Sequence, residues 1–153
     1  SEPVTLPKSF NYPSPLFSIV YTTKHKMNIY HSLTDSLDHV NQSRYIDLYE
    51  DVVHWLVSSK SIENEKVAQF AAAKADALGR VGKIEYMRQV RSGDVVEIIV
   101  NFIAKSATQE LVGFFFELKA ADGGVSNRAF FITSDSEEDL TKSVKLPERT
   151  SRL

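Results

Sequence analysis

The polar segment of residues 35–42 gathers the residue types that could carry out chemistry. The carboxylate of Asp35 could attack a carbonyl carbon directly, or take a proton from a water molecule that attacks it. A helix is predicted to begin near Gln42, and the first amides of a helix are unpaired and lie at the positive end of its dipole. Such amides, here those around Asn41 and Gln42, can stabilise an oxyanion. His39 and Asn41 would orient the loop or the water, so this spacing favours attack on a carbonyl group.

The same residues also have structural interpretations. Asp35 and Asp38 could cap the helix or the turn before it, as aspartates commonly do. His39 could be bonded to backbone, and Asn41 could fix the loop. Other chemistries have less support, because the chain has no cysteine, no pair of histidines at metal-binding spacing and no Gly-x-Ser-x-Gly motif. We therefore expect no metal and no cofactor.

A long helix is the clearest element after this segment. One of its faces collects apolar residues at helical spacing, namely Tyr45, Leu48, Tyr49, Val52 and Leu56. Trp55 and other apolar neighbours widen that face, so the helix should be covered on several sides. We expect Tyr45, Tyr49 and Trp55 in the core, with a place in the lining of a pocket as the alternative. A second, alanine-rich helix is predicted over residues 63–77.

Strands account for most of the remaining chain. One is predicted over residues 17–30, before the polar segment. Turns at residues 92–94 and 122–124 help to separate four later strands, predicted over residues 81–90, 95–104, 109–120 and 125–134. This order predicts an α+β domain in which a curled antiparallel sheet covers one long helix.

Length and composition fit a single domain, because 153 residues can bury a core without disulfides or metals. Four of the five prolines fall within the first fifteen residues, which predicts an irregular arm over residues 1–18. A folded domain over 19–135 and a charged tail over 136–153 would follow. The formal net charge of -2 argues against nucleic acid as the main partner. No membrane span or signal peptide is visible. We expect a cytoplasmic protein, or an organellar one if an upstream targeting segment has been removed.

Two segments resemble the sequence pattern of the 4-hydroxybenzoyl-CoA-thioesterase-like family of hot-dog proteins. In residues 35–50, the family's Asp, His-Val-Asn, Tyr and aromatic–Glu pair are matched by Asp35, His39-Val40-Asn41, Tyr45 and Tyr49-Glu50. Residues 84–94 are similar to the family's strand–turn segment, which ends in Gly-Asp. Two replacements in the first segment depart from the pattern: Asp38 stands where the family usually has Gly, and Gln42 where it usually has Asn or His. In the second segment, Gln89 stands where the family usually has proline.

The resemblance implies a hot-dog fold and hydrolysis of acyl thioesters carried on coenzyme A or acyl carrier protein. It implies Asp35 as nucleophile or general base, with His39 and Asn41 as the other catalytic residues. The residues that would bind substrate are Gln42, Tyr45, Arg88 and Arg91. The two arginines would contact carrier phosphates, and surface ion pairs are the alternative role for them.

Members of this family work as dimers or tetramers, so the resemblance also implies a homodimer or homotetramer. Two other functions stay open at this point. A hot-dog protein could bind acyl thioesters without hydrolysing them, which the replacements at Asp38 and Gln42 keep in consideration. A dehydratase or isomerase is less supported, because the usual hydratase motif is not visible.

Overall fold

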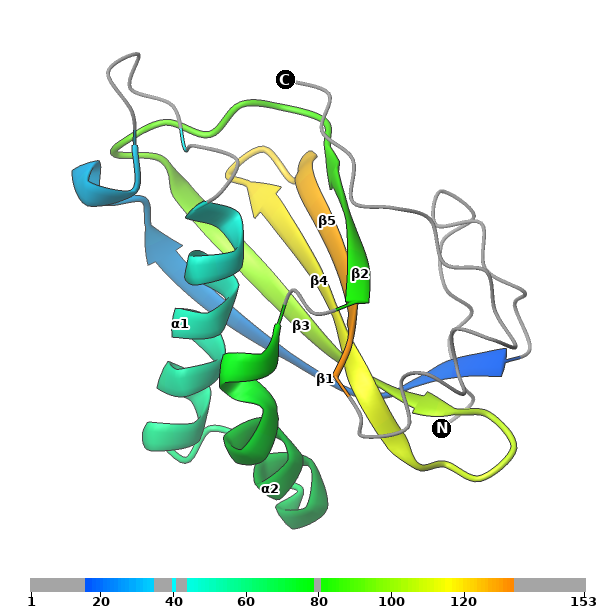
Figure 1. Ribbon diagram of the computed structural model, residues 1–153. Helices are drawn as coiled ribbons and strands as arrows, with labels where there is room; N and C mark the ends of the chain where they lie inside the picture. Colours follow the sequence, from blue (N-terminus) through cyan, green and yellow to red (C-terminus); the bar gives the residue numbers. More distant parts are fainter. Residues whose placement is uncertain (1–15, 35–39, 41–43, 79–80, 134–153) are drawn as a thin grey trace.

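A twisted antiparallel sheet with two helices on one of its faces forms the part of the chain that the computed structural model describes, residues 16–34, 40, 44–78 and 81–133 (Figure 1). The helices are α1 (Arg44–Ser58) and α2 (Glu65–Lys74), and two short 3-10 turns are η3 (His31–Leu33) and η4 (Ala75–Ala77). The strands are β1 (Phe17–Asn28), β2 (Val81–Tyr86), β3 (Val95–Lys105), β4 (Leu111–Ala120) and β5 (Val125–Ile132). Their order in the sheet is β1-β3-β4-β5-β2, with every neighbouring pair antiparallel. The predicted α+β architecture is confirmed.

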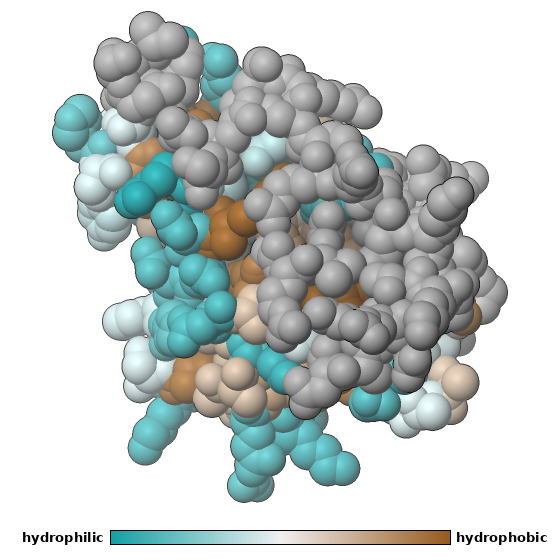
Figure 2. All heavy atoms as spheres, in the orientation of Figure 1, coloured by the Kyte–Doolittle hydropathy of each residue, from teal (hydrophilic) through white to brown (hydrophobic). Residues whose placement is uncertain are grey.

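Alternation along the strands divides the apolar residues between the two faces of the sheet. Phe114 and Phe116 of β4 face the helices and join the main core, whereas Phe115 between them points to the other face. There it joins an outer cluster that consists of Phe17, Ile103, Val112, Phe115, Phe130 and Ile132. In Figure 2, the side that carries the helices shows mostly hydrophilic side chains, with apolar ones visible between them.

Helix α1 lies across the sheet with Tyr45, Tyr49 and Leu56 in the core, as predicted. The prediction for Trp55 is wrong, because its side chain is 54% exposed. Trp55 lies beside β1, where its ring contacts that of His25 at a centroid distance of 5.9 Å. Since β1 is the edge strand, no further strand of the described sheet extends beyond it to cover the indole.

The predicted helix over residues 63–77 is divided between α2 and η4. Helix α2 begins after Asn64, whose side-chain oxygen accepts the Val67 amide at 3.1 Å as an N-cap. After Lys74 the backbone tightens into η4. The imidazole of His54 on α1 lies 2.7 Å from the Asp76 carboxylate, so a side-chain contact also joins α1 to η4.

One predicted strand is too long. Residues 81–90 were expected to form a single strand, but β2 ends at Tyr86. The amides of Met87 and Arg88 both donate to the Ser126 carbonyl, at 3.0 and 3.2 Å. Two residues thus oppose one, which is the arrangement of a β-bulge, and the ladder stops there.

Close approach and turn geometry explain particular glycines. A Cβ on Gly113 of β4 would lie 2.0 Å from the Phe131 carbonyl oxygen of β5, so no side chain fits between these strands. Gly93 and Gly123 both adopt a φ of +87°, which glycine takes without steric cost and which confirms the two predicted turns. No helix in the described part of the chain is long and apolar enough to cross a membrane.

Candidate functional site

The two residues that flank residues 35–39 are held close together. Thr34 and Val40 form an isolated antiparallel bridge, and the Thr34 hydroxyl donates to the His31 carbonyl at 2.7 Å. The buried residue Val40 precedes α1, which begins four residues later at Arg44. The predicted site residues Asp35, His39, Asn41 and Gln42 lie outside the described residues. What the structure establishes is the frame on either side of them.

Hydrogen bonds join this frame to the second segment that carries the resemblance. The Val40 amide donates to the Val90 carbonyl at 2.7 Å. Directly after β1, the Ile29 amide donates to the Asp94 carbonyl at 2.8 Å, and the Gly93 amide donates to the Ile29 carbonyl at 2.9 Å. The two segments, which lie about fifty residues apart in sequence, are therefore neighbours at the start of α1.

The Asp94 side chain closes the turn in the second segment. Its Oδ2 atom accepts the Arg91 amide at 2.9 Å, and its own amide donates to the Arg91 carbonyl at 3.1 Å. Gly93 supplies the left-handed backbone conformation between them. The Gly-Asp pair of the pattern thus has a structural role, which is to hold the chain against β1.

Tyr45, expected to bind substrate, lies in the first turn of α1 and is buried in the main core. Its ring packs edge-to-face on Tyr86 at 5.3 Å and lies 6.5 Å from Tyr49. Burial raises the pKa of Tyr45 well above the usual range, and the nearby Tyr86 raises it further. Its hydroxyl is therefore neutral near pH 7 and suited to hydrogen bonding rather than to proton removal.

A buried polar pair next to Tyr45 could not be predicted from the sequence. The Tyr49 hydroxyl donates to Oδ1 of Asn127 on β5, while its ring stacks on Phe116 at 4.4 Å. Burial is the largest cause that raises the pKa of Tyr49. Nδ2 of Asn127 has no hydrogen-bond partner among the described residues. Only the three-dimensional register brings these two residues together, since 78 positions separate them.

Arg88, the first arginine expected at the carrier phosphates, forms a two-bond ion pair with Asp122. Nη1 donates to Oδ1 at 3.1 Å, and Nη2 donates to Oδ2 at 2.9 Å. The bonds from Arg88 and from the Gly124 amide lower the pKa of Asp122 to about 2. A Cβ on Gly124 would lie 2.0 Å from Nη1 of Arg88, so this glycine leaves room for the guanidinium. Arg88 thus has the ion-pair role given as its alternative, and a phosphate contact stays a prediction.

Arg91, the second of these arginines, is exposed on the turn next to the loop frame. Its described bonds are made by its backbone, to Asp94. Carrier binding by the Arg91 side chain stays a prediction. Among the described residues, no group of three or more His, Cys, Asp or Glu side chains could hold a metal ion.

Glu50 on α1, part of the Tyr49-Glu50 pair in the sequence pattern, is half-buried. Burial raises its pKa, and the carboxylates of Asp47 and Asp76 raise it further. Asp76 belongs to η4, so the pKa of Glu50 depends on the element that follows α2 as well as on α1.

Comparisons with known proteins identify the fold. No protein-family model matches this chain, and no curated protein matches it either. A hypothetical protein from Thermus thermophilus matches with a TM-score of 0.51 at 18% identity, over 72% of this chain and 80% of the other. A 1,4-dihydroxy-2-naphthoyl-CoA thioesterase from Synechocystis matches with a TM-score of 0.50 at 15% identity, over 72% and 78%. This chain has the hot-dog fold.

A further hot-dog structure is similar to this one. A protein from Staphylococcus aureus, characterised in complex with CoA, matches with a TM-score of 0.50 at 14% identity, over 75% of this chain and 80% of the other. At these identities the likeness shows the fold, and the 4-hydroxybenzoyl-CoA-thioesterase-like family stays a prediction. The helix that the hot-dog sheet covers is α1, as expected.

The outer face of the hot-dog sheet carries a charged row across three strands. Arg128 of β5 stands directly opposite Glu117 of β4 and Glu85 of β2. Its Nε atom donates to Glu117 at 3.2 Å and forms an ion pair with it. Glu85 is buried, and its Oε1 atom has no hydrogen-bond partner among the described residues.

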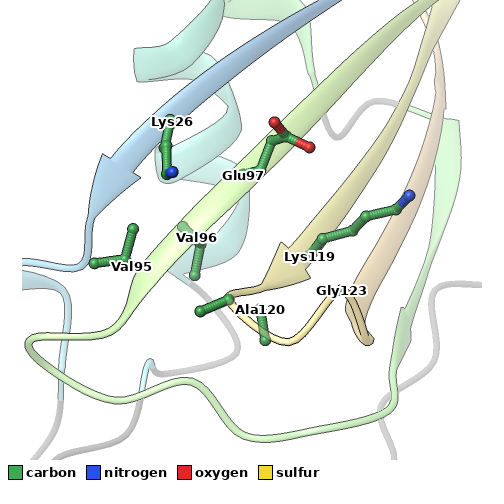
Figure 3. A pocket seen from close by; sticks show the side chains of 8 residues that line it. Lys26, Val95, Val96, Glu97, Lys119, Ala120 and Gly123 are labelled. Carbon is green, nitrogen blue, oxygen red and sulfur yellow. The ribbon is translucent and has the colours of Figure 1, made fainter.

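Three adjoining hollows follow the end of the sheet where β1 stops and β3 starts. One of about 300 Å³ includes Val90 and the Arg88–Asp122 pair, next to the loop frame. A second of about 230 Å³ lies beside Lys26, Glu97 and Lys119 (Figure 3). The third, of about 570 Å³, extends from Lys26 to Tyr30 and Trp55. Of these residues, the sequence singled out Arg88 as a substrate-binding residue and Trp55 as a possible pocket residue, whereas it did not single out Lys26, Glu97, Lys119 or Tyr30.

Proposed function

We propose that this chain hydrolyses acyl thioesters carried on coenzyme A or acyl carrier protein, with Asp35 as nucleophile or general base. The observation that carries this proposal is the frame around residues 35–39. Thr34 and Val40 are bridged, and Val40 is tied to Val90 just before α1 begins. A carboxylate directly after Thr34 would then act close to the start of that helix. A rigid frame of this kind is what a catalytic loop requires.

The chemistry follows from the residue types. The Asp35 carboxylate attacks the thioester carbonyl carbon, releasing the thiolate and forming an anhydride that water then hydrolyses to the free acid and Asp35. Alternatively, Asp35 removes a proton from a water molecule that attacks the same carbon and displaces the thiolate. The backbone amides around Asn41 and Gln42 stabilise the negative charge on the carbonyl oxygen, helped by the dipole of α1. His39 and Asn41 orient the loop or the water.

Two solved structures with this fold support the substrate class. One is a 1,4-dihydroxy-2-naphthoyl-CoA thioesterase from Synechocystis, and the other, from Staphylococcus aureus, was characterised in complex with CoA. The substrate and the ligand in these names are those of the two similar proteins. Together with the residue pattern at Asp35, they favour a CoA or carrier-protein thioester as the substrate of this chain.

The test compares Asp35→Asn with Asp38→Asn in a thiol-release assay over short, long, branched and aromatic acyl-CoA and acyl-carrier substrates. Asp35→Asn should lower kcat by about 10²-fold or more, the usual contribution of a catalytic acid or base. Asp38→Asn is the matched control, because Asp38 replaces the Gly of the residue pattern and has no counterpart carboxylate in it, and the variant should stay close to wild type. Circular dichroism melts show whether both variants are folded. Equal activity of Asp35→Asn and wild type would remove Asp35 from the mechanism.

The same assay separates hydrolysis from binding alone, which the replacements at Asp38 and Gln42 favour. A binding protein would hold acyl-CoA tightly and release no thiol from any substrate in the panel. Turnover of a single acyl group by the wild-type chain, lost in Asp35→Asn, excludes that alternative.

We also propose that the chain forms a homodimer or homotetramer through the β2 edge of its sheet. The other edge, β1, exposes Lys24 and Lys26, and lysines on an edge strand disfavour pairing with another strand. Light scattering on the purified chain measures the assembly, and a monomer at all concentrations would contradict it.

A further inference from the structure

We propose that the end of β1 carries a nucleotide-binding site, in which Trp55 and Tyr30 contact an adenine ring and Lys26 and Lys119 bind its phosphates. The ligand would be the adenosine bisphosphate end of a CoA-type carrier. The site deepens the proposed function and rests on it for the identity of the carrier. Coenzyme A, rather than a carrier protein, would then deliver the acyl group.

The aromatic part of the site is the hollow of about 570 Å³ between the end of β1 and α1. Two large aromatic side chains in its lining are exposed to solvent, Trp55 by 54% and Tyr30 by 62%. Trp55 also contacts the His25 ring, which holds the indole beside the hollow. Exposed aromatic faces of this kind are stacking surfaces for nucleic acid bases, since every base has a π-face.

The cationic part of the site is the adjoining hollow of about 230 Å³, which shares Lys26 and Val95 with the first. Figure 3 shows Lys26, Glu97 and Lys119 side by side on β1, β3 and β4, where the register pairs Lys26 with Glu97 and Glu97 with Lys119. With two strand spacings between them, the backbones of the two lysines lie about 10 Å apart. Figure 3 shows the Lys119 side chain pointing away from Lys26, so it has to turn towards Lys26 for both ammonium groups to contact a common phosphate group.

Both lysines are available for a ligand. None of the ion pairs between described residues includes Lys26 or Lys119, although Glu97 stands between them. The three side chains together carry a net charge of +1, which suits an anion. Ala120 and Gly123, at the turn end of the hollow, are small and leave space near the sheet.

The proposed site connects to the candidate catalytic loop. Tyr30 leads directly into η3 and then into Thr34. The pantetheine arm of coenzyme A leaves the phosphates rather than the base. The hollow of about 300 Å³ that includes Val90 shares Val95 and Ala120 with the cationic hollow, so an arm that leaves the lysines could pass along it towards the start of α1.

A fluorescence titration of the full chain with adenosine 3′,5′-bisphosphate tests the site. Trp55 is the only tryptophan in the chain, so its emission reports on this hollow alone. We expect saturable quenching, and at least about tenfold weaker binding in the double variant Lys26→Ala/Lys119→Ala, because each lysine loses a charge-assisted bond. Glu97→Gln should bind more tightly, since it removes the carboxylate between the lysines.

Lys24→Ala is the matched control. Lys24 is another exposed lysine of β1, and neither hollow includes it, so its variant should bind like wild type. The Trp55→Ala variant has no tryptophan emission, so its binding of the bisphosphate is measured by calorimetry. It should bind more weakly than wild type, and the heat released by the lysine–phosphate contacts should remain. No saturable quenching, or unchanged affinity in the double lysine variant, would overturn the proposal.

A truncated substrate separates this proposal from the proposed function. Acyl-pantetheine has the thioester but no nucleotide. If the chain hydrolyses acyl-pantetheine but does not bind the bisphosphate, the nucleotide site is wrong and the thioesterase function is supported. If the chain binds the bisphosphate saturably but hydrolyses no substrate, the nucleotide site is supported and the thioesterase function is wrong. A higher kcat/KM for acyl-carrier-protein than for acyl-CoA, unaffected by the lysine variants, also counts against the site.

Discussion

The buried bond between Tyr49 and Asn127 makes a sharp prediction about stability. Tyr49→Phe removes the hydroxyl that donates to Oδ1 of Asn127 and keeps the ring that stacks on Phe116. Both polar atoms of the Asn127 side chain are then buried without partners, since its Nδ2 has none among the described residues of the wild-type chain. Asn127→Leu removes the acceptor instead and leaves the buried Tyr49 hydroxyl without its hydrogen-bond partner.

The magnitudes follow from the cost of an unsatisfied buried group. Each single replacement should lower the free energy of unfolding by about 1–3 kcal/mol. The double variant Tyr49→Phe/Asn127→Leu removes both partners and replaces them with apolar groups of similar shape. It should be close to wild type or more stable, because the unpartnered amide disappears as well. The coupling energy of the cycle should therefore be at least about 2 kcal/mol, the sum of the two single losses.

Urea unfolding of the four proteins at pH 7 measures the cycle. A loss of about 2 kcal/mol corresponds to a fall in Tm of roughly 4–8 °C for a chain of this length. Tyr21→Phe is the control, because its hydroxyl accepts the Glu63 amide at 3.1 Å from a half-buried, solvent-accessible position. If the double variant loses the sum of the two single losses, Tyr49 and Asn127 are not coupled and the reasoning fails.

Two further predictions concern the sheet and one of its turns. Gly113→Ala should cost about 3 kcal/mol or more in unfolding free energy, because its Cβ would meet the Phe131 carbonyl oxygen at 2.0 Å. Gly123→Ala, which meets no atom within 4 Å, should cost less, and equal losses in urea unfolding would contradict the close approach of β4 and β5. The Arg88 bond lowers the pKa of Asp122 to about 2, so its stabilising effect is present above the unfolded pKa of about 3.9 and is lost as pH falls towards 2. Asp122→Asn should flatten the fall in stability over that range, and an unchanged acid profile would exclude the pair as a contributor.

Periodicity in the sequence was enough to predict two helices and five strands. Alternation along β4 separates Phe114 and Phe116 from Phe115, as the two-residue repeat of a strand requires. The apolar stripe of α1 correctly placed Tyr45 and Tyr49 inside. These features depend on neighbours within a few residues, so the sequence contains the information directly.

Features that depend on where an element ends, or on what lies beside it, could not be predicted in this way. Trp55 continues the apolar stripe of α1, yet it is exposed because the helix lies beside edge strand β1. The pairing of Tyr49 with Asn127 requires the final register of β5 under α1. Likewise, Arg88 reaches Asp122 only because the β4–β5 turn lies next to the end of β2. Each of these contacts joins residues whose proximity is decided by the assembled sheet.

The error in the length of β2 coincides with the position of the candidate site, and the two have one cause. Residues 87–90 were expected to extend β2, which pairs with β5. The bulge at Met87 and Arg88, which share the Ser126 carbonyl, ends that ladder instead. The Val90 carbonyl is then free to accept the Val40 amide, and Gly93 and Asp94 can bond to Ile29. A local break in strand pairing therefore fixes both ends of the frame around residues 35–39 at the start of α1.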